Sequence, residues 1–160
     1  MHGSASPESR KKMAALCEKT IDINAFIVSK LDMVKLPANT LDEKTIVTYH
    51  DPCHLKKSIG VSDEPRRLIT ANPGYILKEM KEPDSCCGMG GSFNIMHYGL
   101  SDSIGKKKQN NISRTGCSAL ATGCPACMTQ LSDMLSKAGK RIAIKHPIEI
   151  YSEMINDTVS

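Results

Sequence analysis

Five of the seven cysteines follow a spacing that constrains this chain more than any other feature. Cys53 stands alone, the adjacent pair Cys86-Cys87 follows after 32 residues, and Cys124-x-x-Cys127 follows after a further 36. A C-x-x-C motif by itself occurs in zinc sites, thioredoxin-like motifs and iron–sulfur proteins. The pair and the upstream cysteine make the pattern much more specific, and together they predict a thiolate metal site.

The number of cysteines bears on which metal is bound. Structural zinc takes four tetrahedral ligands, so five thiolates leave one in excess. The side chains of the neighbours Cys86 and Cys87 diverge, which suits a cluster of several irons better than one small ion. The count therefore favours an iron–sulfur cluster. Zinc on four of the five cysteines and an empty site with oxidised thiols stay open as alternatives.

A secreted disulfide framework explains these cysteines poorly. Such proteins usually have an even number of cysteines, whereas this chain has seven, and its first ten residues are polar and show no secretory signal. Metal or redox chemistry in a reducing compartment, which we take to be the cytoplasm, is the better explanation.

Hydrophobic periodicity predicts alternating strands and helices. Residues 8–36 have apolar side chains at three- and four-residue steps, with a helix break near Thr20 or Asp22 and an end at Pro37. The expected strands are 45–50, 75–80, 119–122 and 141–145, and later helices are expected from Ser62, from Ser101 to Gly116, from Pro125 and from Pro147. This alternation indicates an α/β fold with a mostly parallel sheet and flanking helices.

The cysteines are placed so that such a fold brings them together. Cys53 follows the expected strand 45–50, Cys124 follows the strand 119–122, and Cys86-Cys87 lie downstream of a third strand. Open parallel sheets form their sites outside the carboxyl ends of the strands. We therefore expect the cysteines to converge at the C-terminal ends of the strands.

Residues beside the cysteines suit a metal site as well. Glycines at 88, 90 and 91 let the backbone approach closely, and their N–H groups can donate to thiolates or sulfides. Cys127 falls in the first turn of its helix, where the helix dipole favours a thiolate. His50 and His54 flank Cys53, and both a hydrogen bond to a cluster and a packing role fit them.

Other polar residues have simpler interpretations. We expect Cys17 and Cys117 to be buried, structural thiols. His146 is expected to hold the turn before the last helix. His97 and Tyr98 follow the glycine-rich turn, which is a weak signal that they border the site. The run 106–108, three lysines, is interpreted as a solvated helix face, with docking to an acidic partner as the alternative.

Composition excludes several classes of protein. The net charge is only +4, aromatic residues make up 4% and tryptophan is absent, so nucleic-acid binding is not expected. No apolar run approaches the ~20 residues of a spanning helix, so no direct membrane insertion is expected. Ser-His-Asp, Walker-type and G-x-G-x-x-G motifs are all missing, which leaves hydrolase, kinase and nicotinamide-binding functions without support.

The strings around the cysteines resemble a known family. The chain is similar to the cysteine-rich CCG domain over roughly residues 44–155, through Tyr49-His50-Asp51-Pro52-Cys53-His54, Cys86-Cys87-Gly88, Gly123-Cys124-Pro125-Ala126-Cys127 and His146-Pro147-Ile148-Glu149. That domain occurs in a subunit of heterodisulfide reductase and in iron–sulfur subunits of glycolate oxidase, lactate-utilisation and anaerobic glycerol-3-phosphate dehydrogenase systems. The resemblance implies a [4Fe–4S] cluster, non-cubane in heterodisulfide reductase, with the ligands Cys53, Cys86, Cys87, Cys124 and Cys127.

The resemblance also implies a function. The first expectation is an electron-transfer domain in an oxidoreductase subunit, taking electrons from a flavoprotein or another iron–sulfur subunit of a complex that oxidises a 2-hydroxy acid such as glycolate or lactate. A disulfide-cleaving cluster, as in heterodisulfide reductase, is the second, and a non-redox zinc-binding module is the third. Contact with a membrane is expected only through a partner.

The expected domain organisation is simple. Residues 1–7 are expected to be a tag remnant or disordered tail, and residues 8–160 a single CCG-type domain, with leading helices in 8–40 and the motif-bearing core in 44–155. Many family members carry two such domains. We therefore expect this chain to be either the C-terminal part of a longer subunit or a standalone copy.

Overall fold

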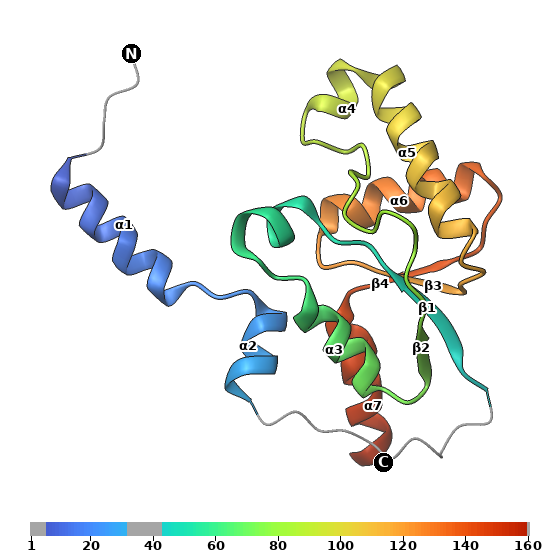
Figure 1. Cartoon of the computed structure of the whole chain (residues 1–160), viewed down its shortest axis with the longest axis horizontal. Coiled ribbons are helices and arrows are strands. Elements are labelled where there is room, and N and C mark those ends of the chain that lie inside the picture. Colours follow the sequence, from blue (N-terminus) through green and yellow to red (C-terminus); the bar gives the residue numbers. More distant parts are fainter. Residues whose placement is uncertain (1–5, 32–42, 160) are drawn as a thin grey trace.

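A four-stranded parallel sheet forms the centre of the computed structural model, which describes residues 6–31 and 43–159 (Figure 1). The strands are β1 (Thr45–Tyr49), β2 (Tyr75–Leu77), β3 (Ala119–Ala121) and β4 (Ala143–Lys145), in the order β2-β1-β3-β4. Every neighbouring pair is parallel. The predicted α/β fold is confirmed, although β2 and β4 are shorter than the expected strands 75–80 and 141–145.

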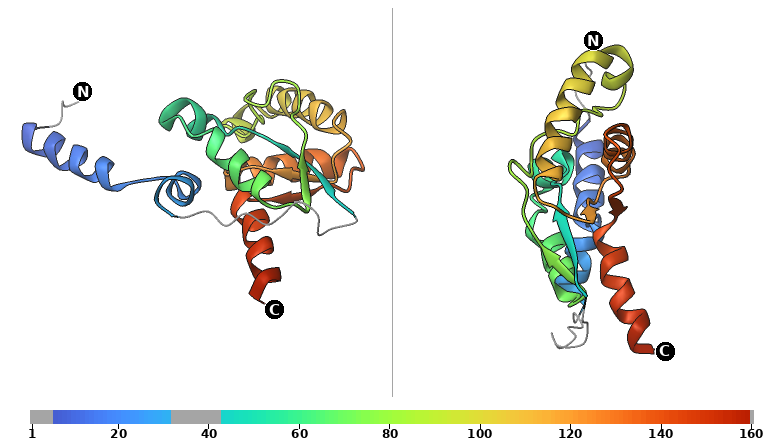
Figure 2. Two further views of the ribbon diagram at one scale, coloured as in Figure 1. Left: turned by 60° about the horizontal axis from the view of Figure 1, so that its bottom comes forward. Right: turned by 90° about the vertical axis from the view of Figure 1, so that its right-hand side faces the viewer.

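Helices cover both faces of this sheet (Figures 1 and 2). On one face Leu120 of β3 packs with residues of α5 (Tyr98–Ser113) and α6 (Pro125–Lys137). On the other face Ala119 and Ala121 pack with residues of α3 (Asp63–Ala71) and α7 (Pro147–Val159). Successive side chains of a strand point to opposite faces, so one short strand contributes to both halves of the core.

The strand order creates a topological switch point beside β1. The chain passes from β1 to β2 on one side and then crosses to β3 on the other side. The register pairs Tyr49 with Ala121, and the His50 N–H donates to the Ala121 carbonyl at 2.9 Å. In open α/β sheets, binding crevices form at the carboxyl ends of strands where the order reverses. Here those ends belong to β1 and β3.

Two helices precede the sheet, α1 (Pro7–Lys19) and α2 (Ile23–Lys30). The predicted break is confirmed, because the Asp22 carboxylate accepts the N–H groups of Asn24 and Ala25 at the start of α2. The helix α1 extends away from the sheet and buries none of its residues (Figures 1 and 2). The predicted burial of Cys17 is therefore wrong: it is exposed, because α1 packs too loosely against the other described residues to bury any of its side chains. The expected end at Pro37 and most of the expected tail, residues 1–5, lie outside the described residues.

Three local predictions differ from the structure. The expected loop after Cys53 contains a short π-helical segment, η1 (His54–Ser58). The helix expected from Ser101 begins earlier, at Tyr98, and follows a short helix, α4 (Phe93–Met96), which the sequence did not predict. Ser101 is not a helix cap, because its hydroxyl lies buried inside α5 and donates to the Gly88 carbonyl at 2.8 Å.

Among the helices of the described residues, none is long and apolar enough to cross a membrane.

Candidate metal centre

Three of the five cysteines lie just beyond the carboxyl ends of β1 and β3. Cys53 follows β1 after three residues and directly precedes η1. Cys124 occupies the N-cap position of α6, and Cys127 lies in the first turn of that helix, which Pro125 begins. Proline suits the first helical position because its fixed φ is already helical and its missing N–H needs no partner there. The predicted convergence at strand ends is confirmed for these three cysteines.

The other two cysteines reach the same place differently. Strand β2 ends at Leu77, and Cys86-Cys87 follow only after eight further residues, within a segment, 78–92, that contains no helix or strand. We call residues 78–92 the cysteine loop. The loop leads from β2 to α4 (Figure 1), and it brings the Cys87 sulfur within 3.3 Å of the Cys127 sulfur.

All five cysteines of the motif line one cavity of about 190 Å³, which we call the cysteine cavity. The residues that complete its lining are two histidines and a set of small or flexible residues, namely His50, His54, Met89, Gly90, Gly91 and Ala126. The two flanking histidines predicted from the sequence therefore border the site. Its donor set is dominated by sulfur, which is the preference of iron–sulfur clusters, zinc and copper(I).

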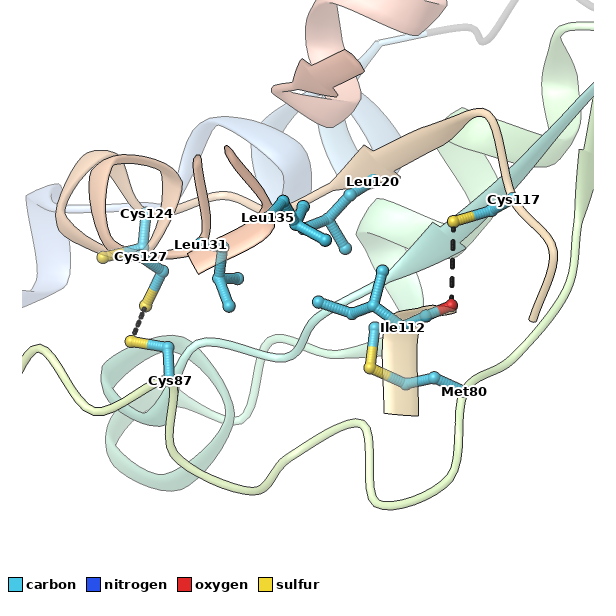
Figure 3. Close-up of a cluster of buried hydrophobic side chains, with 9 residues drawn as sticks. All are labelled: Met80, Cys87, Ile112, Cys117, Leu120, Cys124, Cys127, Leu131 and Leu135. Carbon is cyan, nitrogen blue, oxygen red and sulfur yellow. Dashed lines mark hydrogen bonds between the residues drawn. The ribbon is translucent and has the colours of Figure 1, made fainter. Parts of the chain in front are cut away.

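Two thiols in this cavity interact directly. The sulfur atoms of Cys87 and Cys127 lie 3.3 Å apart, within hydrogen-bonding distance (Figure 3). The hydrogen bond with Cys127 lowers the pKa of Cys87, and the same bond raises the pKa of Cys127, because a thiol beside a thiolate resists losing its own proton. The pair therefore favours one thiolate, which is the form that binds metals.

His50 points a free ring nitrogen at these sulfur atoms. Its side chain is only 1% exposed, and its Nδ1 lies 3.1 Å from the Pro83 carbonyl oxygen. A carbonyl can only accept, so Nδ1 donates to it, and Nε2 is the ring nitrogen left for the sulfur atoms. Nε2 has no hydrogen-bond partner among the described residues, and a ring nitrogen of His50 and the sulfurs of Cys87 and Cys127 all lie within 4.8 Å of one another. This is a third donor for a metal at the inner end of the cavity.

Gly88 allows the cysteine loop to pass close to α5. Its φ is +96°, and a Cβ at this position would lie 2.6 Å from the Ser101 carbonyl oxygen. Both observations exclude a larger residue without movement of the backbone. The glycine that follows the cysteine pair is therefore required by the packing of the loop.

A buried ion pair holds the end of β1 in front of Cys53. The Asp51 side chain is fully buried, and its two oxygens accept Arg66 Nη1 at 2.8 Å and Nη2 at 2.9 Å. Burial favours the neutral acid, but the hydrogen bonds and charge of Arg66 outweigh it and hold the pKa of Asp51 below its ordinary value. A bidentate pair of this kind is geometrically strict, so it fixes the segment that carries His50 and Cys53.

The other candidates lie outside the cysteine cavity. Cys117 is buried, as predicted, but at the far end of the apolar cluster from Cys87 and Cys127 (Figure 3). His97 and Tyr98 do not line the cavity. His146 has the expected structural role, because its Nδ1 accepts the Ile148 N–H at 3.2 Å at the start of α7.

The lysine run on α5 contains a residue whose position was not predicted. Lys106 and Lys107 are solvated, as expected, but Lys108 is 0% exposed. A spacing signal was present, because Lys108 lies three or four residues from the buried Gly105, Asn111 and Ile112 on the same helix. The prediction missed the burial of Lys108 because it treated all three charged side chains of the run as solvated.

Comparison with known families matches the part of the chain that contains the cysteine cavity. A family model described as the CCG cysteine-rich domain matches residues 47–132, which is more than half of the chain. That interval contains all five cysteines of the cavity and both flanking histidines.

Several curated proteins are similar to the chain. A fumarate reductase (CoM/CoB) subunit of Methanothermobacter marburgensis is 38% identical over 74% of this chain and 24% of its own length. Lactate utilization protein A of Oceanobacillus iheyensis is 29% identical over 90% of this chain and 58% of its own length. A probable glycolate oxidase iron-sulfur subunit of Bacillus subtilis is 32% identical over 83% of this chain and 30% of its own length. The chain thus spans about a quarter to three fifths of these relatives.

Proposed function

The chain belongs to the CCG family of cysteine-rich domains, and we propose that it is an iron–sulfur electron-transfer domain of an oxidoreductase subunit. The observation that carries this proposal is the gathering of five thiols, from three separate segments, around one cavity. An iron–sulfur cluster supplies one-electron transfer, while the protein supplies its ligands and its electrostatic surroundings.

We assign the ligands to Cys53, Cys86, Cys87, Cys124 and Cys127, and the group to a [4Fe–4S] cluster of cubane or non-cubane form. Five sulfur donors around one cavity exceed the four that a single zinc ion takes, which suits a cluster of several irons. The lowered pKa of Cys87 and the first-turn position of Cys127 both favour thiolates. A zinc ion on four of these thiols is the competing occupant, particularly in the isolated chain.

Relatives suggest the setting in which the electrons move. Proteins named for lactate utilisation and glycolate oxidase match 83–90% of this chain, compared with 74% for the CoM/CoB fumarate reductase relative. We therefore favour a complex that oxidises a 2-hydroxy acid, with a flavoprotein or a second iron–sulfur subunit as the electron donor. Free thiols on this scale suit a reducing compartment such as the cytoplasm.

The domain boundaries form part of the same proposal. Residues 8–160 are taken as one CCG-type unit, whose motif-bearing core spans 44–155. The three relatives are longer than this chain, which spans 24%, 58% and 30% of their respective lengths.

Anaerobic reconstitution with iron and sulfide tests the proposal. The expected result is about four irons and four sulfides per chain, with a visible charge-transfer band and an EPR signal in one oxidation state. Cys127→Ser is expected to lose most of the bound iron, whereas Cys117→Ser, which removes a buried thiol outside the cavity, is expected to keep it. One tightly held zinc per chain, with failed reconstitution, would instead identify a zinc module.

Disulfide cleavage is the second candidate, because the relative with 38% identity carries the CoM/CoB designation. The measurement is reoxidation of the dithionite-reduced, loaded protein by small organic disulfides. Reoxidation that yields two thiols per disulfide would favour this function. If the disulfides do not reoxidise the protein, the electron-transfer proposal remains in place.

A further inference from the structure

Lys108 is an ammonium group buried behind the cysteine loop. Its Nζ donates to the carbonyl oxygens of Glu82 at 2.7 Å and Pro83 at 3.1 Å, and it lies 3.9 Å from the Met80 sulfur. Its neighbour Lys107 instead has a side chain that is 64% exposed and forms an ion pair with the Glu82 carboxylate. Two consecutive lysines of one helix therefore interact with the same loop, one from inside the protein and one from solvent.

The Pro83 carbonyl links this lysine to the cysteine cavity. Its oxygen accepts three donors: Lys108 Nζ at 3.1 Å, His50 Nδ1 at 3.1 Å and the Asp51 N–H at 3.0 Å. His50 lines the cavity and turns its other nitrogen towards Cys87 and Cys127. One carbonyl oxygen thus joins α5, the cysteine loop and the end of β1, and Lys108 is one of its supports.

Lys108 has no carboxylate as a direct ion-pair partner among the described residues, although the charges of Asp84, Asp51 and Glu82 favour its ammonium form. Within the described part of the chain it forms no ion pair, although its neighbours on α5 do. Burial lowers the pKa of its amino group to about 8, against weaker favourable interactions with Asp84 and Cys87, so the ammonium form predominates at pH 7. A buried cation costs free energy unless negative charge lies nearby. A cavity lined by thiolates adds to the negative charge of the nearby carboxylates when it is loaded.

We propose that Lys108 is a positioning residue whose buried positive charge makes reduction of the cysteine-bound cluster more favourable. This inference rests on the proposed function. One electron, from a reduced flavin or a second iron–sulfur centre, makes the site one unit more negative, while no bond of the protein breaks and no proton is required. A fixed cation interacts more favourably with the more negative state, and the low dielectric of the interior preserves the effect.

The test compares variants at two adjacent positions. Lys108→Met removes the buried charge, Lys108→Gln removes it but keeps a donor for the carbonyls, and Lys108→Arg keeps it. Lys107→Met removes the same charge from the surface, where solvent and salt screen it. Each reconstituted protein is titrated spectroelectrochemically at pH 7, with iron and sulfide measured on the same sample.

The neutral Lys108 variants are expected to shift the midpoint to more negative potential. The ratio of reduced to oxidised cluster at a fixed applied potential should fall about tenfold, which is about 59 mV for one electron. Lys108→Arg and Lys107→Met should stay near the wild-type value. A merely structural role would lower cluster content or thermal stability without this pattern in the potential.

Each other outcome also decides the question. Equal midpoints in the wild type and both neutral variants overturn the inference and leave the proposed function intact. If Lys108→Arg takes up iron and neither neutral variant does, the site requires the positive charge. If the wild type takes up iron and all three Lys108 variants fail to, the inference is overturned, because the role of Lys108 is then packing. A wild type that takes up no iron or sulfide defeats the proposed function, and this inference with it.

Discussion

The cysteine cavity has two walls that are built in different ways. The helix wall, Cys124 and Cys127, stands at the junction of β3 and α6, where the order strand, glycine, cysteine, proline sets the local geometry. The loop wall, Cys86 and Cys87, lies in a segment without helix or strand. Neighbouring residues in the sequence determine the first wall, whereas the second depends on side chains from distant elements.

Three contacts from α5 hold the loop wall. Lys108 donates to two loop carbonyls, the Ser101 hydroxyl donates to the Gly88 carbonyl, and the backbone of α5 leaves space only for a glycine at 88. A site whose ligands arrive on a loop must have that loop held by its surroundings, since the loop lacks the repeating hydrogen bonds of a helix. The comparison predicts that substituting residues that hold the loop wall lowers stability and iron uptake more than substituting residues at the start of α6.

The largest effect is expected from Gly88→Ala. The new Cβ would meet the Ser101 carbonyl oxygen at 2.6 Å, and alanine disfavours a φ of +96°. We expect a loss of about 3 kcal/mol in the free energy of unfolding, measured by urea titration of the reduced apoprotein, and loss of iron uptake. Gly139→Ala is the control, because φ there is +65° with nothing within 4 Å, and it should cost only about 1 kcal/mol.

The second effect is a pH dependence that belongs to Lys108. The pKa of Lys108 is about 8 in the folded protein, whereas the ordinary value of 10.5 applies to the unfolded chain. Between pH 8 and pH 10.5 the unfolded chain therefore binds more protons than the folded protein, and the free energy of unfolding rises with pH. Below pH 8 both states are protonated and the contribution is constant. Urea unfolding of the reduced apoprotein should show wild type gaining about 2 kcal/mol more than Lys108→Met between pH 8 and pH 10. Parallel curves for the two proteins would contradict the burial of a charged Lys108.

Ser101→Ala should have a smaller effect on the same wall. It leaves the buried Gly88 carbonyl without its hydroxyl donor, for an expected loss of about 1 kcal/mol in the free energy of unfolding. The matched control is Ser103→Ala, whose hydroxyl donates to Gly99 on the exposed side of the same helix. A difference of less than a few tenths of a kcal/mol between the two variants would mean that this hydrogen bond does not hold the loop.

The smallest effect is expected on the helix wall, from Pro125→Ala. Alanine is compatible with the first position of α6, so only the conformational restriction of proline is lost, about 0.5 kcal/mol. Iron content after reconstitution should match that of the wild type. If this variant instead lost iron as Gly88→Ala is expected to, the distinction between the two walls would be wrong.

Much of the arrangement could be predicted because it follows from local patterns. The β-branched run before Asp51 forms β1, Asp22 caps α2, and Pro125 and Pro147 begin α6 and α7. The sequence also placed Cys53 and Cys124 after strands, from which convergence follows in a parallel sheet. Two errors, Cys17 and Ser101, share one cause: each depends on which distant element packs against a helix, and a helix pattern contains no such information. For Lys108 the helical spacing to Ile112 was a signal of burial, but its charge indicated a solvated position.

The sequence by itself determined the thiol set, the α/β fold and the edge of the sheet where the site forms, because side-chain periodicity and cysteine spacing are properties of the chain. Only the tertiary structure decided that His50 turns a free nitrogen to the sulfurs, that Cys87 and Cys127 share a hydrogen bond, and that one lysine of three is buried. These features arise where α5, the cysteine loop and the end of β1 meet at the Pro83 carbonyl. Burial and hydrogen-bond partners at such a junction are set by three segments at once, and none of them is encoded within a single stretch of sequence.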